Sequence, residues 1–170
     1  MNYVIVATLS ALLACAAWAY WPAPTLAPGV VVDRIVVYKA DRRLELIHGD
    51  EVVAAYRVAL GPQPVGPKRE VGDGKTPEGK YTIDYHNPES RFHLALHISY
   101  PSSREAEAAR ADGSEPGGMI MIHGLKNGLG KVGRIHTFLD WTDGCIAVMN
   151  SEIEQIYNVV KDGTPIRIEP

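Results

Sequence analysis

The distribution of charge divides the chain into two unequal parts. Residues 1–29 contain no Lys, Arg, Asp or Glu, whereas residues 30–170 carry all 17 basic and all 20 acidic residues. Val4–Trp21 is an uncharged, mostly apolar run close to the roughly 20 residues that a helix needs to cross a bilayer. Three prolines follow, ending any helix and forming a stiff spacer. We therefore expect a membrane anchor or signal segment with a Pro-rich spacer over 1–29, and one compact domain over 30–170.

Three fates are open for the N-terminal segment. A retained anchor over residues 4–21 is favoured by the length of the run and by interfacial aromatic residues at its end, Trp18 and Trp21 among them. A cleaved signal peptide fits Ala17–Ala19, although no positive charge precedes the run, and a lipoprotein signal would use Cys15. An anchored or secreted domain would lie in the periplasm or otherwise outside the cytoplasmic membrane. A cytoplasmic domain with an accidental apolar run is the remaining alternative.

Composition excludes several classes of function. The chain is 46% apolar and 22% charged, as expected of an ordinary folded domain. A net charge of -3, without any stripe of Lys and Arg, argues against a nucleic-acid partner. Zinc is disfavoured because Cys145 has no second Cys nearby, and His93 and His97 lie on an expected strand. We expect no metal and no organic cofactor.

The domain is rich in short β-type segments separated by turns. Expected strands cover residues 30–38, 43–48, 52–60, 81–85, 92–99, 119–122 and 166–168. Gly61–Glu78 holds four Pro and four Gly and is expected to be loop. Helices are expected over Ser102–Ala111 and behind a capping box at Ser151–Glu154. The expected fold class is mainly β, a sandwich or barrel with a few short helices.

Cys145 is the candidate nucleophile. The chain has two cysteines, and Cys15 lies in the N-terminal segment, so an exported domain would hold a single thiol in an oxidising compartment. Gly144 before the thiol lets backbone N–H groups approach a substrate carbonyl. Asp143 could orient a His or bind a cationic group, and Thr142 could contact an imidazole, but a turn explains both residues. A buried structural thiol is the competing interpretation.

A thiol becomes nucleophilic when an imidazole takes its proton, so the chain must supply a histidine. His123 is the first candidate, because it follows the expected strand 119–122 and precedes Gly124. His136 is the second, in the stretch just before Cys145. We expect ordinary surface or hydrogen-bonded roles for the remaining four histidines, His48, His86, His93 and His97.

These residues resemble the signature of a known family. Ile122–Gly124, followed by Thr142–Val148 in the pattern Thr-x-Gly-Cys-Ile, is similar to the signature of the L,D-transpeptidase (YkuD-like) catalytic domain. Gly74–Tyr81 resembles the Thr-Pro-x-Gly-x-Phe/Tyr segment of the same family. The resemblance covers roughly Arg34–Ile168, and three motifs in the right order make it specific. It implies an L,D-transpeptidase-like β-rich fold with the Cys and His in a cleft.

The resemblance also assigns roles. Cys145 is the implied nucleophile, His123 the general base and acid, and Gly144 with Cys145 the source of backbone oxyanion donors. Thr142 takes the place of the family's Ser/Thr, and Gly124 belongs to the His-Gly pair.

Two departures stand out. Many members have His directly before Gly-Cys, where this chain has Asp143. The gap of 22 positions between His123 and Cys145 is long, and it leaves room for His136 to assist or to form part of a substrate groove.

The implied reaction is acyl transfer on peptidoglycan. Cys145 would attack the carbonyl of the diamino acid in a stem peptide, expel D-Ala, and pass the acyl group to an amine of another stem peptide or of an envelope protein. Two alternatives remain open. One is a cysteine amidase or endopeptidase that acts on peptidoglycan or on a protein–peptidoglycan link, and the other is a non-catalytic module that binds the cell wall.

Overall fold

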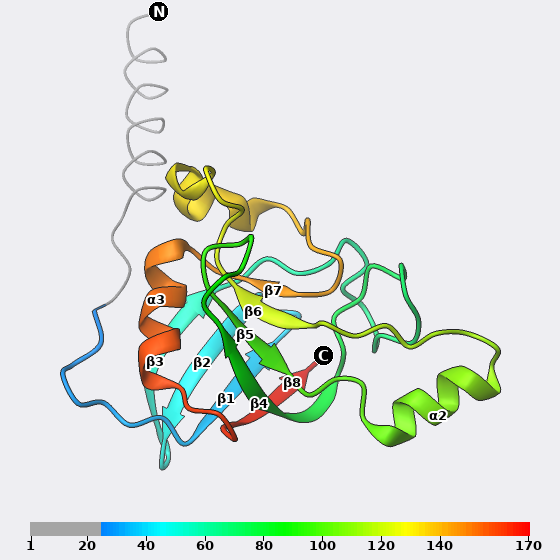
Figure 1. The fold of residues 1–170 in the computed structure, drawn as a ribbon. Coiled ribbons are helices and arrows are strands. Elements are labelled where there is room, and N and C mark those ends of the chain that lie inside the picture. Colours follow the sequence, from blue (N-terminus) through cyan, green and yellow to red (C-terminus); the bar gives the residue numbers. More distant parts are fainter. Residues whose placement is uncertain (1–24) are drawn as a thin grey trace, which may run out of the picture.

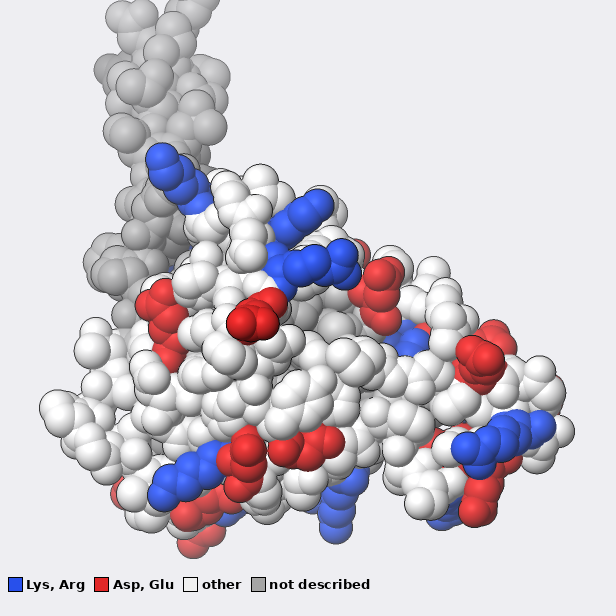
Figure 2. All heavy atoms as spheres, viewed as in Figure 1, with Lys and Arg blue, Asp and Glu red and all other residues white. Residues whose placement is uncertain are grey.

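Residues 25–170 are described by a computed structural model, in which eight strands and three helices follow one another (Figure 1). The elements are β1 (Arg34–Tyr38), β2 (Arg43–His48), β3 (Glu51–Arg57), β4 (Gly79–Asn87), β5 (Ala95–Ile98), α2 (Ser103–Ala111), β6 (Met121–His123), the 3-10 helix η1 (Gly130–Phe138), β7 (Ile146–Ala147), α3 (Asn150–Val159) and β8 (Pro165–Glu169). The expected anchor at residues 4–21 lies outside the described residues. Within 25–170, no helix combines the length and apolar character that crossing a bilayer requires. On the face shown in Figure 2, Lys and Arg side chains are interspersed with Asp and Glu side chains.

All eight strands belong to one mixed sheet in the order β3-β2-β1-β8-β4-β5-β6-β7. Two neighbouring pairs, β1 with β8 and β6 with β7, run parallel, and the others are antiparallel. The sheet curls so far that its edges meet, because Ala59, just after β3, exchanges two 2.9 Å backbone hydrogen bonds with Ala147 of β7. The expected mainly β fold class is confirmed, in the form of a curled half-barrel sheet with short helices.

The hydrophobic core lies between the inner face of the sheet and α3. Alternate residues of β1, Ile35 and Val37, are fully buried, as the two-residue period of a strand requires. On α3, Ile153 and Ile156 are buried at helical spacing, and the helix packs against β5 and β6. Burial of this apolar surface is the main favourable contribution to folding, and it fixes β6 and β7 on a rigid support.

Two helix starts test the capping predictions. The helix expected from Ser102 is confirmed, with Ser102 as its N-cap: its hydroxyl accepts from the N–H of Glu105 at 3.3 Å, and its own N–H donates to that carboxylate at 2.8 Å. The box expected at Ser151 is wrong. The N-cap of α3 lies two residues earlier, at Met149, so the helix begins at Asn150, and the N–H of Met149 donates to the buried Glu152 carboxylate at 2.9 Å. Glu152 and Glu154 lie three residues after Met149 and Ser151, so a Glu is available at the third helical position in either register.

The strand expected over 92–99 is shorter in the structure. β5 begins only at Ala95, because His93 has a φ of 71°, a left-handed conformation that a strand cannot contain. The residues before it, Phe92 among them, form an irregular turn. Gly61–Glu78 is loop as expected.

Candidate active site

The pairing of β6 with β7 brings the two main candidates together. In this parallel pair Ile122 lies opposite Ile146, and His123 lies opposite Ala147. Both isoleucines are fully buried in the core, so the alternation of a strand directs His123 to the other face. Cys145 directly precedes β7 and, by the same register, shares that face.

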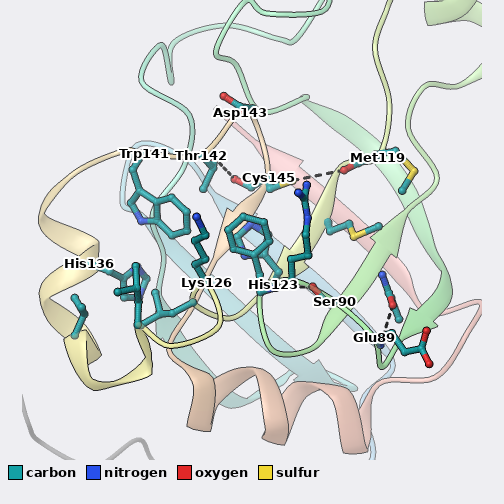
Figure 3. Close-up of a pocket in the computed structure, with 17 residues that line it drawn as sticks. Glu89, Ser90, Met119, His123, Lys126, His136, Trp141, Thr142, Asp143 and Cys145 are labelled. Atoms are coloured by element: carbon teal, nitrogen blue, oxygen red, sulfur yellow. Dashed lines mark hydrogen bonds between the residues drawn. The ribbon is translucent and has the colours of Figure 1, made fainter.

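The shared face opens into a pocket of about 780 Å³, which both candidate residues line (Figure 3). Its walls come from the β4–β5 connection, from β6 and the residues before and after it, from η1, and from the turn before β7. The lining includes Glu89, Ser90, Arg91, Phe92, Met119, Met121, Leu125, Lys126, Leu129, Val132, His136, Trp141, Thr142 and Asp143. Two stretches of the sequence, residues 87 to 92 and 119 to 145, thus line a single concave site.

His123 is held in one tautomer. Its Nδ1 lies 2.7 Å from the carbonyl oxygen of Gly124. Because a carbonyl can only accept, Nδ1 carries the proton and Nε2 of the neutral ring is left as the acceptor. Phe92 packs on the imidazole with a centroid distance of 4.6 Å, and Trp141 meets it edge-on at 5.8 Å. Burial among these groups lowers the pKa of His123.

The thiol of Cys145 is also neutral in the resting protein. Burial raises its pKa, and the nearby Asp143 carboxylate adds to that effect. Its Sγ donates to the carbonyl oxygen of Met119 at 3.5 Å. Within residues 25–170 no hydrogen bond joins Sγ to His123. The arrangement is therefore a neutral thiol and a neutral imidazole in one pocket, which can transfer a proton as a substrate is attacked.

Thr142 shapes the turn that carries the thiol. Its hydroxyl donates to the carbonyl oxygen of Cys145 at 2.7 Å and accepts from the N–H of Gly144 at 3.2 Å. Thr142 was expected either to stabilise a turn or to contact an imidazole. The structure shows the turn role, and among the described residues the hydroxyl forms no hydrogen bond to an imidazole. The N–H of Gly144 is thereby occupied, so its role as an oxyanion donor stays a prediction.

Two glycines permit close packing around the dyad. Gly144 has a φ of 112°, and a Cβ there would overlap the carbonyl oxygen of Lys75. A Cβ on Gly124 would lie 2.8 Å from Oδ1 of Asn150 and 3.0 Å from the carbonyl oxygen of Phe92. Any side chain at either position would displace a residue that forms the site.

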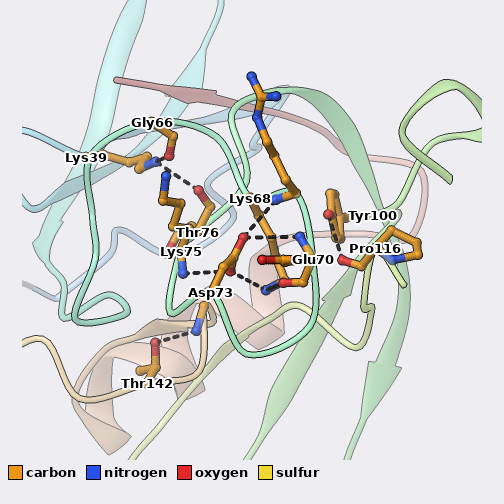
Figure 4. A network of polar contacts seen from close by, with 12 residues as sticks. Lys39, Gly66, Lys68, Glu70, Asp73, Lys75, Thr76, Tyr100, Pro116 and Thr142 are labelled. Atoms are coloured by element: carbon orange, nitrogen blue, oxygen red, sulfur yellow. Dashed lines mark hydrogen bonds and ion pairs between the residues drawn. The ribbon is translucent and has the colours of Figure 1, made fainter. Parts of the chain in front are cut away.

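The loop Gly61–Glu78 lies against this turn and is fixed by a buried ammonium (Figure 4). Lys39 is 1% exposed, and its Nζ donates at 2.8 Å to the carbonyls of Gly66 and Thr76 and to the carboxylate of Glu78. Such a cation is stable in the interior only when it is fully paired. A single Lys at the end of a strand gives no sequence signal for this role.

A carboxylate organises the other end of the loop. Asp73 accepts from Nζ of the buried Lys68 at 2.7 Å and from the backbone N–H groups of Arg69 and Lys75 at 2.8 and 3.0 Å. These donors lower the pKa of Asp73 although burial opposes the shift. Lys75 therefore links Asp73 to the turn before Cys145, because its N–H donates to Asp73 and its carbonyl oxygen packs on Gly144.

The structure separates the two remaining candidates. His136 is 8% exposed and lines the pocket, where its ring meets Trp141 edge-on with a centroid distance of 6.3 Å. Burial and the neighbouring His123 lower its pKa to about 4. Asp143 is exposed at the rim and forms no hydrogen bond to an imidazole in the described part of the chain, so the turn explains it best.

The other four histidines each contact a carboxylate outside the Cys145–His123 pair, at 3.0 Å or less. The pairs are His48–Asp33, His86–Asp162, His93–Glu154 and His97–Asp84. Over residues 25–170 no group of three His, Cys, Asp or Glu side chains is arranged to hold a metal ion. These contacts agree with the ordinary roles expected for the four residues.

Sequence reasoning missed the aromatic and basic walls of the pocket. Phe92 and Trp141 enclose His123, and Arg91 and Lys126 add two cations to the lining. Trp141 had one available signal, its position directly before the Thr-x-Gly-Cys motif. Phe92 had none, because its placement follows from the left-handed turn at the next residue.

The half-buried thiol of Cys145 and the buried imidazole of His123 thus lie on one face of a curled mixed sheet and line one pocket. Residues 32–168 match the family model YkuD, the L,D-transpeptidase catalytic domain. The chain therefore belongs to the L,D-transpeptidase (YkuD) catalytic-domain family.

Relatives support the same placement. The chain is 30% identical over 132 residues to "Putative L,D-transpeptidase YafK" of Escherichia coli (strain K12), covering 74% of this chain and 46% of the relative. The helical cell shape determining protein Pgp2 of Campylobacter jejuni superposes with a TM-score of 0.62 at 25% identity, over 81% of this chain and 47% of Pgp2. Bd1075 of Bdellovibrio bacteriovorus shares the fold, with a TM-score of 0.55 at 24% identity, over 84% of this chain and 49% of that one. The chain thus spans about half the length of these relatives.

Proposed function

We propose that this protein is a peptidoglycan L,D-transpeptidase with Cys145 as nucleophile and His123 as general base and acid. The observation that carries the proposal is the placement of both side chains on one face of the β6–β7 pair, in one pocket. The bond from Nδ1 of His123 to Gly124 leaves Nε2 free to take a proton. Membership of the L,D-transpeptidase family supports the same chemistry.

The proposed reaction has two halves. Nε2 of His123 accepts the thiol proton while Sγ of Cys145 attacks the carbonyl carbon of the stem-peptide diamino acid. The bond from that carbon to the nitrogen of the terminal D-Ala then breaks, and the imidazolium of His123 protonates the leaving amine. In the second half an amine attacks the thioester, gives its proton to His123, and releases the thiol of Cys145 with a new amide bond formed.

The proposed acceptor is an amine of a second stem peptide or of an envelope protein. We place the reaction outside the cytoplasmic membrane, with residues 4–21 as the anchor. The substrate, peptidoglycan, is an extracytoplasmic polymer, and the C. jejuni relative is named for cell shape. Protease added to spheroplasts should digest the domain, and full protection of the domain would contradict this location.

A product assay tests the proposed function. Purified protein is incubated with tetrapeptide muropeptides, and the products are identified by mass spectrometry. Loss of D-Ala with formation of cross-linked dimers is the expected result, and the Cys145→Ala variant should form none. Monomers that lose only D-Ala, or that are cut elsewhere, would instead establish a cysteine hydrolase. A wild-type thiol that neither reacts with muropeptides nor is acylated by a carbapenem would leave only the non-catalytic wall-binding module.

A further inference from the structure

Exposed apolar side chains gather at one place on the domain, in and just after η1. Of the twelve large hydrophobic side chains that are exposed in the described part of the chain, six lie within residues 129–141. Three of the six, Ile135, Phe138 and Leu139, are 45%, 65% and 74% exposed, and the pocket does not explain them because they do not line it. With the exposed Lys131, they form what we call the η1 patch. A concentration of exposed apolar surface on a folded domain marks a site that contacts another surface.

The surroundings of the η1 patch are basic. Lys126 and Lys131 are exposed, and residues 116–139 contain no Asp or Glu, although the whole chain has a net charge of -3. In Figure 2, Lys and Arg side chains stand at the end of the molecule that carries η1 in Figure 1. By contrast, the exposed Val52 directly follows an acidic residue, Glu51. Apolar side chains flanked by cations match a surface that is both anionic and able to take up apolar groups, which is the surface of an anionic phospholipid bilayer.

The N-terminal end of the described chain enters the domain close to η1. The N–H of Leu26 donates to Oε1 of Gln155 on α3 at 3.2 Å, and Leu26 packs against the core. Gln155 lies five residues after Asn150, the first residue of α3, which is about 8 Å along a helix. Asn150 in turn lies against Gly130, the first residue of η1, where a Cβ would be 2.7 Å from Nδ2 of Asn150. The entry point and η1 therefore lie beside the same helix (Figure 1).

The proposed anchor brings a bilayer within reach of this end of the domain. Residues 4–21 are the proposed span, and residues 22–25 separate them from Leu26. A Pro-rich stretch extends by about 3.1 Å per residue, so the end of the span lies at most roughly 15 Å from Leu26. Tethering over so short a distance makes docking on the bilayer an intramolecular event and raises the effective concentration of lipid at the η1 patch.

We propose that the η1 patch docks on an anionic phospholipid bilayer, with its three apolar side chains among the headgroups and Lys131 on the lipid phosphates. The proposal goes beyond the proposed reaction and rests on the proposed anchor for the nearness of the bilayer. Val132, next to Lys131, lines the pocket, as does Leu129. Docking therefore places the mouth of the pocket at the lipid surface, and substrate close to the membrane is the substrate that it reaches.

Fluorine NMR tests the docking, because the chain contains only two phenylalanines. The full chain is labelled with fluorophenylalanine and reconstituted into phosphatidylglycerol nanodiscs that carry a small fraction of nitroxide-headgroup lipid. Phe138 reports on the η1 patch, Phe92 in the pocket is the internal control, and the signal lost in Phe138→Leu assigns the two. The nitroxide should relax the Phe138 signal at least about fivefold faster than the Phe92 signal. In phosphatidylcholine nanodiscs this excess should fall, because attraction of one Lys to anionic lipid is worth about fivefold in binding.

Variants separate docking from mere nearness to the bilayer. The double substitution Ile135→Ser with Leu139→Ser should reduce the excess relaxation at least about fivefold in both lipids, and Lys131→Glu should reduce it most in phosphatidylglycerol. The matched controls are Val65→Ser, at an 84% exposed valine, and Lys80→Glu, at an exposed lysine of β4, and both should leave the excess unchanged. All five side chains are exposed, so the melting temperature should not fall in any variant.

Equal relaxation of the two signals in phosphatidylglycerol nanodiscs would overturn the docking, as would an effect of Val65→Ser as large as that of the patch substitutions. A Phe138 shift that follows the concentration of the chain rather than the lipid would overturn it in favour of a second copy of the chain.

Retention of the chain by the nanodiscs tests the anchor separately. A chain retained by phosphatidylcholine nanodiscs that shows no excess relaxation in either lipid keeps the anchor and loses the docking. A chain retained only by phosphatidylglycerol nanodiscs, with the excess, loses the anchor and keeps the docking, and a chain retained by neither loses both. The transpeptidase reaction is decided by the product assay, whichever of these results is found.

Discussion

Burial acts on both members of the candidate dyad and keeps both uncharged. It lowers the pKa of His123 and raises the pKa of the Cys145 thiol, so neither effect favours a resting thiolate–imidazolium pair. The thiol is instead expected to lose its proton during the attack, to the Nε2 atom that the Gly124 contact leaves free. This state also protects a lone thiol from oxidation, because the thiolate is the reactive form.

The pH profile of the reaction should reflect these shifts. A histidine with a lowered pKa remains a neutral base at pH values where an ordinary imidazole, with a pKa of 6.5, is half protonated. The acidic limb of kcat/KM is therefore expected below pH 6.5, and the alkaline limb above pH 9.0, where an ordinary thiol ionises. A profile measured with a neutral acyl donor checks this. A limb of the profile that fell between pH 6.5 and pH 9.0 would contradict these two shifts.

His136 should make the stability of the protein depend on pH. Its pKa is about 4 in the folded state and 6.5 in a model peptide, so between these values the unfolded chain binds a proton that the folded chain does not. Stability is therefore lost as the pH falls from 6.5 towards 4, by up to about 3 kcal/mol from this residue. Urea unfolding of wild type and His136→Phe at pH 7 and pH 4.5 measures the difference. An equal loss in both proteins would contradict the assignment.

At the scale of elements, the sequence predicts the strands better than it predicts their ends. β2 matches the expected range, and α2 begins at its expected cap, because strand alternation and a Ser before a helix are local signals. The predicted start of α3 is wrong because two Glu residues can each occupy the third helical position of a capping box, Glu152 after Met149 and Glu154 after Ser151. The candidate nucleophile and base are indicated by motifs, whereas the pairing of Lys39 with the loop depends on contacts between residues 27 to 39 positions apart.

Removal of the buried ammonium should release the loop that packs against the turn before Cys145. In Lys39→Met the carboxylate of Glu78, 18% exposed, and the carbonyls of Gly66 and Thr76 lose their common donor. We expect a loss of about 2–4 kcal/mol in the free energy of unfolding and a larger fall in kcat than in KM. Denaturant unfolding and steady-state kinetics measure both. Lys80→Met, on an exposed position of β4, is the control, and a Lys39 variant that matched it would refute the role.

At the scale of the whole molecule, the topology joins distant parts of the chain. β1 pairs with β8, and the segment after β3 pairs with β7, so both connections link residues about 90 to 130 positions apart. Local patterns carry no information about such pairings, and the mainly β class was therefore predictable while the strand order was not. The bridge between Ala59 and Ala147 closes the curl beside Cys145, which couples the stability of the sheet to the geometry of the site.

Breaking this bridge should affect the whole fold. Ala59→Pro removes the N–H that donates to Ala147 at 2.9 Å, and it leaves a buried carbonyl without its partner. We expect a loss of about 3 kcal/mol or more in unfolding free energy, together with faster amide exchange in β7. Ala59→Gly keeps the N–H donor and should lower the free energy of unfolding by only about 1 kcal/mol. Equal effects of the two substitutions would show that the bridge does not hold the sheet closed.

The most direct test of the central claim is the intact mass of the protein during reaction with a stem tetrapeptide. A quenched reaction should show an adduct on Cys145 equal to the peptide minus D-alanine, with free D-alanine released in the same amount. The adduct should be absent from Cys145→Ala and should disappear when an acceptor amine is added. Release of D-alanine without any adduct, or at an unchanged rate in Cys145→Ala, would contradict a thioester mechanism.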